Sequence, residues 1–394
     1  MTAESTLLPS ERRARLVAEL RANGSARVTD LARTLGVTPV TVRRDLLQLA
    51  QEGVLEKVHG GARLPATDEA DTGPARAGTP AAGLGAGPGA ADAGPGGVGR
   101  GLRTIGMVVP SLDYYWPEVI RGARTTAPGA GVRIILRGSS YEAGEVRRQV
   151  AALVGGAGSG VDGVLVAPPT EGDEGTELAL WLSTLEVPVV LMERRATVGP
   201  YQEHLESVVT DHALGAGLAV RHLAAEGHRR IGLVTTRYSP TSRGVRQGWQ
   251  ETVETLGLDR DVPDLATVNH SEAAWAKDVG RILDACRPGP GGPGTSGATA
   301  LLVHSDPEAI SLAQRAQERG LRIPQDLAIV AYDDEVAALA DPPITAIRPP
   351  KSTIGATAVE LLARRIEQGR DRPVHRVLLS PRLIVRASSV TPRH

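Results

Sequence analysis

Strands and helices alternate over most of this 394-residue chain, and this alternation constrains the fold more than any other feature. From Thr104 onward, short runs rich in β-branched residues are separated by segments whose apolar residues recur at helical spacing. The pattern predicts an α/β architecture, with parallel sheets that carry helices on both faces. The expected strands are Thr104–Val109, Val132–Leu136, Gly163–Ala167, Val187–Met192, Arg230–Thr235, Ala300–His304 and Leu327–Tyr332. The expected helices include Glu142–Val154, Gly215–Glu226, Val245–Leu256 and Glu308–Arg319.

Ligands of open α/β sheets bind at the carboxyl ends of the strands. Polar residues that come directly after each expected strand are therefore the candidate site residues.

Residues 65–103 differ in composition from the chain on either side: 11 of these 39 residues are glycine, 10 alanine and 5 proline. Such a segment cannot bury enough apolar surface to offset its ordering entropy, so we expect a disordered linker. Its GLGAGPGA run could alternatively be a nucleotide-binding loop, but no strand precedes it and no helix follows it. The Gly/Pro-rich residues 288–297 are expected to form a second disordered insertion, on the surface.

Charge is distributed unevenly along the chain. Residues 10–64 carry ten Arg or Lys and six Asp or Glu, a net charge of +4, which leaves about −5 for the rest because the total is −1. This asymmetry is typical of a chain with one end that binds a polyanion.

Cys286 is the only cysteine, which excludes an intramolecular disulfide and a cysteine-based zinc site. The sequence shows neither a signal peptide nor an apolar run of the roughly 18 residues that span a membrane, so we expect a cytoplasmic protein.

Residues 10–52 are expected to be helical, because their apolar residues recur at helical spacing, and a helix-turn-helix signal lies within them. Thr29 or Asp30 can cap a short helix over Leu31–Leu35, and Gly36 supplies the turn. Thr38 is then a good N-cap, with Pro39 at the first helical position. The helix that follows would bury its apolar residues and leave its arginines facing outward, where they can contact guanine edges or phosphates in the major groove.

A β-hairpin wing is expected from residues 54–58 and 62–64 around two glycines. Basic residues of such a wing can reach phosphate or the minor groove. The expected DNA-binding residues of the helix and wing are Thr38, Val40, Thr41, Arg43, Arg44, Lys57, His59 and Arg63.

This N-terminal segment resembles the winged helix-turn-helix of the DeoR family, whose recognition helix has a Thr–aliphatic–Arg–Arg–Asp–Leu core. That core is TVRRDL at residues 41–46 here, and the match covers about residues 10–64. The resemblance implies an α+β winged helix-turn-helix domain over residues 1–64 that binds double-stranded operator DNA. An amphipathic three-helix bundle with solvated charges is the alternative.

From Thr104 to about Val390 the chain is similar to the effector domain of the LacI/GalR regulators, itself similar to periplasmic sugar-binding proteins. The likeness lies in TIGMVVPSLDYYWPEVIRGA, VDGVLVAPP, VPVVLMERR, RHLAAEGHRRIGLVT, SPTSRGVRQGWQETVETLGL and LAIVAYDDEVAALADPPITAIRPP. It implies, over residues 104–390, two Rossmann-like lobes of the periplasmic-binding-protein type I kind, with an effector in the cleft between them. The crossovers are expected near residues 209–211, 348–350 and 369–373. The first lobe would then hold about residues 104–210 and 349–370, and the second about residues 211–348 and 373–390.

The same resemblance implies which side chains bind the effector. Tyr115 and Trp116 follow the first strand, where the family places aromatic residues against a sugar ring. Arg243 stands at the position of the family's sugar-binding arginine, and Asp333 at that of its hydroxyl-accepting aspartate. An arginine together with carboxylates can bind vicinal hydroxyls through charge-assisted hydrogen bonds. The complete expected set is Asp113, Tyr115, Trp116, Glu193, Arg243, Ser305, Asp306 and Asp333, with Ser139 and Ser140 as weaker candidates.

Structural roles remain open for several of these residues. Asp306 or Asp334 could only cap a helix, Arg243 could bridge the lobes without touching ligand, and Trp249 is expected to pack in the core. Ser305 stands where the family has an amide, which leaves the ligand's hydrogen-bond pattern open.

Together the two resemblances predict a transcription regulator, most simply a repressor, that binds operator DNA and responds to a small sugar-like effector. We expect a homodimer or higher homo-oligomer. The composition of residues 65–103 argues against the ordered hinge helix by which LacI-type regulators couple their domains. A cytoplasmic sugar-binding protein without a regulatory role is the alternative.

Neither an enzyme nor a bound cofactor or metal is expected. The sequence shows no metal-ligand spacing and no activated nucleophile, and the adjacent His304, Ser305 and Asp306 do not make a catalytic triad, whose members meet in space rather than in sequence.

Overall fold

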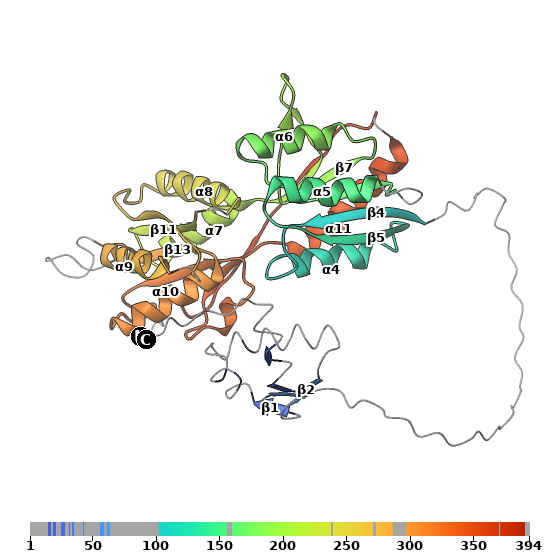
Figure 1. Cartoon of the computed structure of the whole chain (residues 1–394). Coiled ribbons are helices and arrows are strands. Elements are labelled where there is room, and N and C mark those ends of the chain that lie inside the picture. Colours follow the sequence, from blue (N-terminus) through green and yellow to red (C-terminus); the bar gives the residue numbers. More distant parts are fainter. Residues whose placement is uncertain are drawn as a thin grey trace, which may run out of the picture. The chain divides into compact units, whose positions relative to one another are not determined.

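The computed structural model describes residues 102–155, 160–237, 239–270, 273–286, 297–369 and 371–390 (Figure 1). Nearer the N-terminus it describes residues 15–16, 19–20, 25–27, 31, 34, 42, 56–58 and 61–63. The contacts divide the chain into two units, residues 1–93 and 94–394. The expected linker up to residue 101 and residues 288–296 of the expected insertion lie outside the described residues.

The N-terminal unit contains a small antiparallel sheet of order β1-β3-β2, formed by β1 (Ser25–Arg27), β2 (Glu56–Val58) and β3 (Gly61–Arg63). Val58 pairs with Gly61, which confirms the expected hairpin over shorter strands. The expectation of helix throughout residues 10–52 was wrong at β1, because the backbone of these residues pairs with β3 instead. Apolar residues that set the helical spacing are buried: Leu16, Leu20, Leu31 and Val42.

The first lobe of the C-terminal unit is built on a six-stranded parallel sheet of order β16-β10-β7-β6-β4-β5. Its strands are β4 (Arg103–Val109), β5 (Val132–Gly138), β6 (Gly163–Val166), β7 (Val189–Met192), β10 (Ser207–Thr210) and β16 (Arg376–Leu379). Its helices are α4 (Trp116–Thr126), α5 (Ala143–Val154), α6 (Gly172–Ser183) and α11 (Lys351–Gln368). A short hairpin of β8 (Thr197–Val198) and β9 (Glu203–His204) follows β7.

The second lobe repeats this architecture with a six-stranded sheet of order β12-β11-β13-β14-β15-β17. Its strands are β11 (Ile231–Thr236), β12 (Asp264–Thr267), β13 (Ala300–His304), β14 (Ala328–Tyr332), β15 (Thr345–Arg348) and the antiparallel edge strand β17 (Arg382–Ile384). Its helices are α7 (His212–Ala225), α8 (Ser242–Thr255), α9 (Trp275–Ala285), α10 (Asp306–Glu318) and the 3-10 helix η1 (Ala337–Leu339). The predicted α/β class, with two Rossmann-like lobes, is confirmed.

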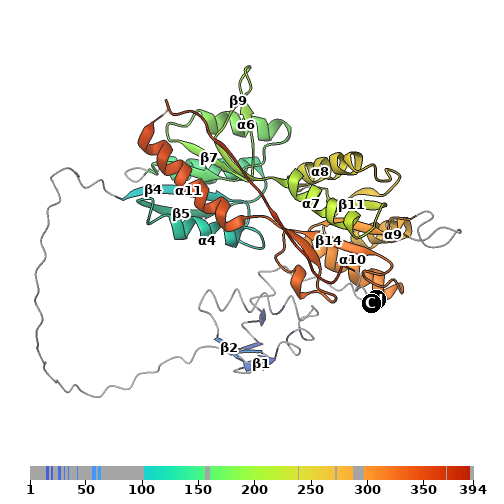
Figure 2. The same cartoon turned by 180° about the vertical axis from the view of Figure 1, so that it is seen from behind.

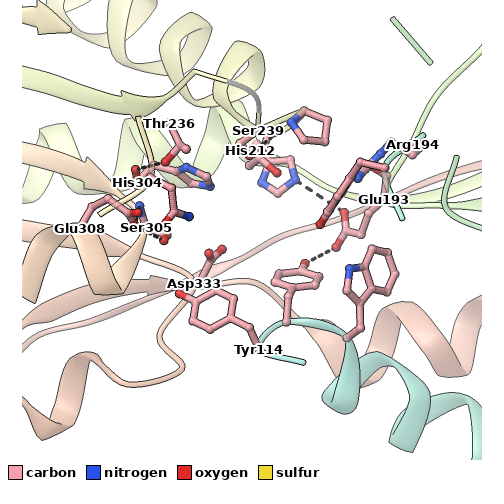
Figure 3. A pocket seen from close by; sticks show the side chains of 16 residues that line it. Tyr114, Glu193, Arg194, His212, Thr236, Ser239, His304, Ser305, Glu308 and Asp333 are labelled. Carbon is pink, nitrogen blue, oxygen red and sulfur yellow. Dashed lines mark hydrogen bonds and ion pairs between the residues drawn. The ribbon is translucent and has the colours of Figure 1, made fainter. Parts of the chain in front are cut away.

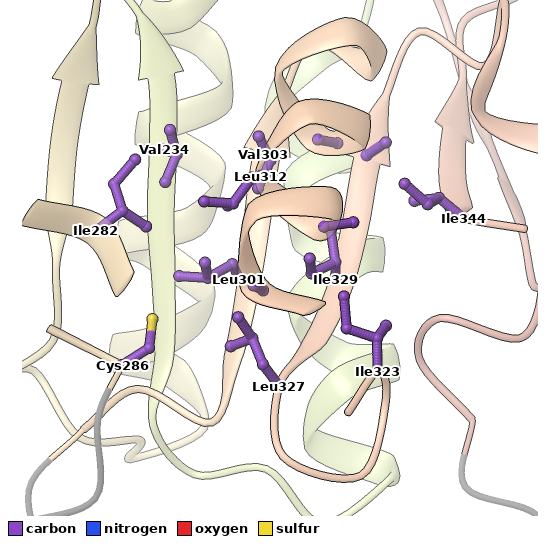
Figure 4. Packing of buried hydrophobic residues seen from close by; sticks show 14 of the residues in the cluster. Val234, Ile282, Cys286, Leu301, Val303, Leu312, Ile323, Leu327, Ile329 and Ile344 are labelled. Carbon is purple, nitrogen blue, oxygen red and sulfur yellow. The ribbon is translucent and has the colours of Figure 1, made fainter. Parts of the chain in front are cut away.

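Each sheet is covered by helices on both faces, because successive strand residues point to opposite sides and both sides are apolar. In β13, Leu301 and Val303 pack toward α9 and α10, while Ala300 and Leu302 pack toward α7 and α8. Figure 4 shows the first of these two cores, which also buries the lone Cys286 at the end of α9. Burial raises the pKa of that thiol to about 12, so it remains protonated at neutral pH.

Helices on the same face approach each other closely at glycines. A Cβ on Gly122 of α4 would lie 1.8 Å from the carbonyl oxygen of Ser352, and one on Gly355 of α11 would lie 1.9 Å from the carbonyl oxygen of Val119. The two helices therefore pack backbone against backbone, which holds α11 on the first lobe.

Three crossovers connect the lobes: Asp211, Pro349–Pro350 and Ser380–Pro381 (Figure 2). The third was expected at residues 369–373, which was wrong because β16 still belongs to the first sheet. The Gly- and Pro-containing break is instead the turn from α11 into that edge strand. Arg365 stabilises the turn by donating hydrogen bonds to the carbonyls of Arg372 and Pro373, and it forms an ion pair with Glu206 at 2.8 Å.

No helix within the described residues is both long enough and apolar enough to cross a membrane.

Candidate functional site

A cavity of about 210 Å³ lies between the two lobes (Figure 3). The first lobe contributes side chains that follow β4, β5 and β7: Tyr114, Tyr115, Trp116, Tyr141, Glu193 and Arg194. The second lobe contributes α7 and the loops after β11, β12, β13 and β14, through His212, Thr236, Ser239, Pro240, Thr241, Asn269, His304, Ser305, Glu308 and Asp333. The cavity therefore lies where the carboxyl ends of both sheets meet, as the strand–helix alternation predicts.

Aromatic rings form one wall of this inner cavity. Tyr115 and Trp116 contact each other edge to face, with ring centroids 5.7 Å apart. Trp116 is only 3 % exposed and packs mainly in the core of the first lobe, so the cavity meets little of its surface. The Tyr115 hydroxyl donates to Glu193, which fixes the ring, and Nζ of Lys351 lies 5.1 Å from the centre of that ring.

Glu193 is buried and its carboxylate is already bound on both oxygens. Thr210 donates from its backbone N–H at 2.9 Å and from its hydroxyl at 2.7 Å, and His212 Nε2 lies 3.6 Å away. Burial acts to raise the pKa of this carboxyl, but the interactions with His212, Thr210 and Tyr115 outweigh it and lower the pKa to about 2. Glu193 therefore orients its neighbours as an ionised group.

Ser305 and Glu308 form a second bound pair, at the start of α10. The Ser305 hydroxyl donates to Glu308 at 2.6 Å, and the backbone N–H of His270 donates to the same carboxylate at 3.0 Å. Burial opposes ionisation of Glu308, but the bonds from His270 and Ser305 lower its pKa to about 2. Next to this pair, burial lowers the pKa of His304 to about 4, so the ring is neutral at pH 7.

Asp333 lies near Ser305 in the cavity, in a backbone conformation with φ of 105°. Burial raises the pKa of its carboxyl to about 6, although Lys351, His212 and a hydrogen bond from Tyr114 act in the opposite direction. Lys351 also binds the Asp333 carbonyl oxygen. The carboxylate is thus an acceptor held at the centre of the site.

Five of the eight residues expected to bind the effector line this cavity: Tyr115, Trp116, Glu193, Ser305 and Asp333. Arg243 does not. It lines a separate outer cavity of about 810 Å³ whose other lining residues are Thr170, Glu171, Gly172, Arg237, Ser239, Ser242, Arg246, Gln247 and Gln250. Arg243 and Gln247 lie on the face of α8 that points there. The helix begins at Ser242, three residues before the expected start.

Asp306 is fully buried and does not line the inner cavity. Its carboxylate accepts hydrogen bonds from the backbone N–H groups of residues 334–337, at 2.6 to 3.2 Å. It therefore shapes the loop after β14 that carries Asp333. Asp113 lies outside the cavity as well, in an exposed turn where its N–H donates to the Ser111 hydroxyl at 3.0 Å.

The other eleven lining residues were not predicted from the sequence: Tyr114, Tyr141, Arg194, His212, Thr236, Ser239, Pro240, Thr241, Asn269, His304 and Glu308. Arg194 and His212 are each the second residue after a strand, β7 and β10, so the same rule of polar residues after strands could have found them. Among the described residues, no group of three or more His, Cys, Asp or Glu side chains is arranged to hold a metal ion.

Most of the expected DNA-binding residues lie outside the described residues: Thr38, Val40, Thr41, Arg43, Arg44 and His59. The backbone of Lys57 lies in β2 and that of Arg63 in β3, so these two residues belong to the hairpin.

Two protein families match separate parts of the chain. Residues 12–68 match the DeoR-like helix-turn-helix domain, and residues 220–389 match the periplasmic binding protein-like domain. The first of these matches includes the small sheet, and the second includes all of the second-lobe sheet.

Among curated proteins, the HTH-type transcriptional repressor PurR of Aliivibrio salmonicida is 29 % identical over 269 residues, which is 67 % of this chain and 75 % of PurR. The arabinose metabolism transcriptional repressor of Geobacillus stearothermophilus is 28 % identical over 307 residues, which is 73 % of this chain and 77 % of that protein. The HTH-type transcriptional repressor CytR of Escherichia coli is 27 % identical over 293 residues, with coverage of 73 % and 79 %.

Among solved structures, the transcription regulator GntR from Chromobacterium violaceum matches with a TM-score of 0.59 and 26 % identity, over 73 % of this chain and 99 % of that one. The complex of the transcriptional regulator CelR with cellobiose matches with a TM-score of 0.59 and 26 % identity, over 72 % and 84 %. The chain thus joins a DeoR-like helix-turn-helix domain to a periplasmic-binding-protein-like domain that is similar to that of LacI-family transcription repressors.

Proposed function

We propose that this chain is a transcription repressor whose affinity for operator DNA is set by a small sugar-like effector bound in the inner cavity. The observation that carries the proposal is the cavity itself, because both lobes line it and three crossovers join them there. A ligand that contacts both lobes fixes their relative orientation, and a change of that orientation is a signal that a second domain can use.

The DNA-binding half of the proposal rests on residues 1–64. The match to a DeoR-like helix-turn-helix supports a recognition helix that carries Arg43 and Arg44, with Lys57 and Arg63 in the wing. Arginines in the major groove can contact guanine edges or phosphates, and the net charge of +4 over residues 10–64 favours binding to a polyanion.

The effector half rests on the chemistry of the cavity walls in residues 104–390. The Tyr115 ring offers a face for the apolar side of a sugar ring, and Asp333 offers a carboxylate for hydroxyl groups. Two similar proteins are named for sugars, one in complex with cellobiose and one as a repressor of arabinose metabolism. The proposal includes no catalytic step and no cofactor.

Residues 65–103 would connect the two halves in place of a hinge helix, so the signal would pass through the arrangement of two subunits. We expect a homodimer, because a two-fold symmetric regulator binds a two-fold symmetric operator. Such a regulator acts in the cytoplasm, where its operator lies.

A mobility-shift assay tests the proposal with the full chain and the DNA upstream of its own gene at low salt. Retention of this DNA, but not of an unrelated fragment of equal length, is the expected result. The double variant Arg43→Ala/Arg44→Ala should lose retention, while Arg315→Ala, an exposed arginine on α10, should keep it. Failure to retain any DNA at low salt would refute the regulator assignment.

A further inference from the structure

We infer that the effector carries an anionic group, a phosphate or a carboxylate, which Arg194 binds in the inner cavity. This inference rests on the proposed function, since it concerns the ligand of the same site. It goes beyond that function because neutral sugars and anionic sugar derivatives are different classes of effector.

Arg194 is a buried cation, only 7 % exposed, two residues after the end of β7 and beside Glu193 in Figure 3. Its Nη1 donates to the backbone carbonyl of Glu193 at 2.7 Å, while its Nε has no hydrogen-bond partner among the described residues. Within the same residues its guanidinium has no carboxylate within ion-pair distance. A buried charge without a paired counter-charge is costly, so a residue that keeps one indicates a counter-charge that arrives with a ligand.

Two of the three carboxylates that line the cavity, those of Glu193 and Glu308, are engaged by other residues. Glu193 and Glu171 attract Arg194 electrostatically, but neither forms an ion pair with it. The oxygens of Glu193 accept hydrogen bonds from Tyr115 and Thr210 and lie beside His212. Glu308 is bound by Ser305 and by His270. Neither carboxylate is free to form the bidentate pair that a guanidinium prefers. A phosphate or carboxylate of a ligand could form this pair with Arg194.

The outer cavity adds positive charge next to the inner one. It shares Ser239 with the inner cavity, and arginines 237, 243 and 246 line it. Arg246 is neutralised by Asp264 at 2.9 Å, and Glu171 is the one acidic side chain among the described lining residues. Arg237 and Arg243 therefore leave this region positive, which attracts anions and raises their rate of association.

A neutral sugar could stack on Tyr115 and donate hydrogen bonds to Asp333, but it would leave the Arg194 charge without an ion-pair partner. An anionic derivative could make all three interactions. The distribution of charge in the site therefore favours the anionic derivative.

The test uses the full chain and matched ligand pairs: pentoses and hexoses, their monophosphates and the corresponding uronic acids, with inorganic phosphate alone as a further probe. Binding is followed by titration calorimetry and by the increase in Tm. We expect at least one anionic member to bind about 10-fold or more tightly than its neutral counterpart, as a charge-assisted hydrogen bond allows. The monophosphates and uronic acids distinguish phosphate from carboxylate as the bound group.

Two variants and one control separate ligand binding from folding. Arg194→Met should remove the preference for the anion and should leave the Tm of the free protein unchanged or raised, because it removes a buried charge. Arg194→Lys should keep part of the preference, since it keeps the charge but loses the planar fork. Arg315→Gln, an exposed arginine on α10, should behave as the wild type.

Equal or tighter binding of the neutral members would overturn the inference, as would the absence of binding by every anionic member. A lower Tm for free Arg194→Met would overturn it too, because Arg194 would then serve the fold. None of these outcomes touches retention of operator DNA, so failure of the inference is distinguishable from failure of the proposed function.

Discussion

Glu193 of the first lobe lies 3.6 Å from Nε2 of His212 in the second lobe, at the first crossover (Figure 3). The same carboxylate accepts two hydrogen bonds from Thr210. Glu193 therefore contacts both Thr210 and His212, the residues on either side of the crossover residue Asp211. A rotation of the lobes about this crossover would change the Glu193–His212 distance. The cavity wall and the connection between the lobes therefore share one side chain, which couples ligand contacts to lobe orientation.

Glu193→Gln should destabilise the C-terminal unit. Loss of the charge weakens the bonds from Tyr115, Thr210 and His212, and we expect the free energy of unfolding to fall by about 2 kcal/mol. Urea unfolding followed by tryptophan fluorescence measures this difference. Glu177→Gln, an exposed residue on α6, is the matched control and should change little.

The same variant has a pH signature. Because the folded-state pKa of Glu193 lies near 2, below its ordinary value of 4.5, its stabilisation is complete above pH 4.5 and is lost as the pH falls toward 2. Glu193→Gln should therefore lose less stability than the wild type over this interval. Equal acid-induced losses in both proteins would contradict an ionised, bonded Glu193.

Asp333→Asn should weaken effector binding about 10-fold or more and leave operator binding intact, since a hydroxyl bound to a carboxylate gains a charge-assisted hydrogen bond. In the wild type, effector affinity should fall as the pH drops below about 6, where the Asp333 carboxyl becomes protonated. The variant should lose this component of the pH dependence. Calorimetric titration at pH 5.5 and 7.5 measures both effects, with the exposed Asp341→Asn as the control.

The raised pKa of Asp333 predicts the opposite behaviour for the stability of the free protein. A carboxyl with a folded pKa of about 6 and an ordinary value of 3.8 contributes stability below pH 3.8, and this contribution is lost as the pH rises through 6. The stability of Asp333→Asn relative to the wild type should thus be greater at pH 7.5 than at pH 4. The reverse trend would show that Asp333 is not held in a desolvated position.

Asp306→Asn should destabilise the protein without any ligand present. Its carboxylate accepts N–H groups from residues 334–337, and an amide retains only one acceptor oxygen, so we expect a loss of about 2–4 kcal/mol. Asp284→Asn, whose carboxyl is 64 % exposed, is the control. An unchanged free energy of unfolding together with a lost effector response would instead identify Asp306 as a ligand contact.

The sequence predicts the architecture well because periodicity reports burial directly. Leu301 and Val303 face one helical layer while Ala300 and Leu302 face the other, and the uninterrupted apolar run of residues 300–303 is typical of a strand buried on both faces. The carboxyl-end rule then locates the cavity and five of the eight expected residues.

Side-chain direction within the first turn of a helix is harder to predict. Asp306 begins α10, and its carboxylate turns toward the loop after β14 rather than into the cavity. Arg243 is the second residue of α8, and only the structure shows that it lines the outer cavity and not the inner one. The prediction of the third crossover was wrong for a related reason. The break at Gly369 marks a change of chain direction, but only the pairing of Arg376 with Ser207 shows that the chain returns to the first sheet.

Operator binding should depend on salt through the arginines of the recognition helix. Log affinity should fall linearly with log salt concentration, and each lost phosphate contact should reduce the slope by about 0.9. Arg43→Gln and Arg44→Gln should each weaken binding, and a change of slope separates phosphate contacts from base contacts. Neither variant should alter the effector-induced increase in Tm, because the effector binds in the other unit of the chain.

The most direct test of the account is an effector titration of the full chain bound to fluorescently labelled operator DNA, followed by anisotropy. The effector should release the DNA, or tighten its binding if it acts as a corepressor, over the concentration range in which it raises the Tm of the protein. Asp333→Asn should shift both curves together. Operator binding that does not change while the effector saturates the cavity would contradict the claim that this cavity controls DNA binding.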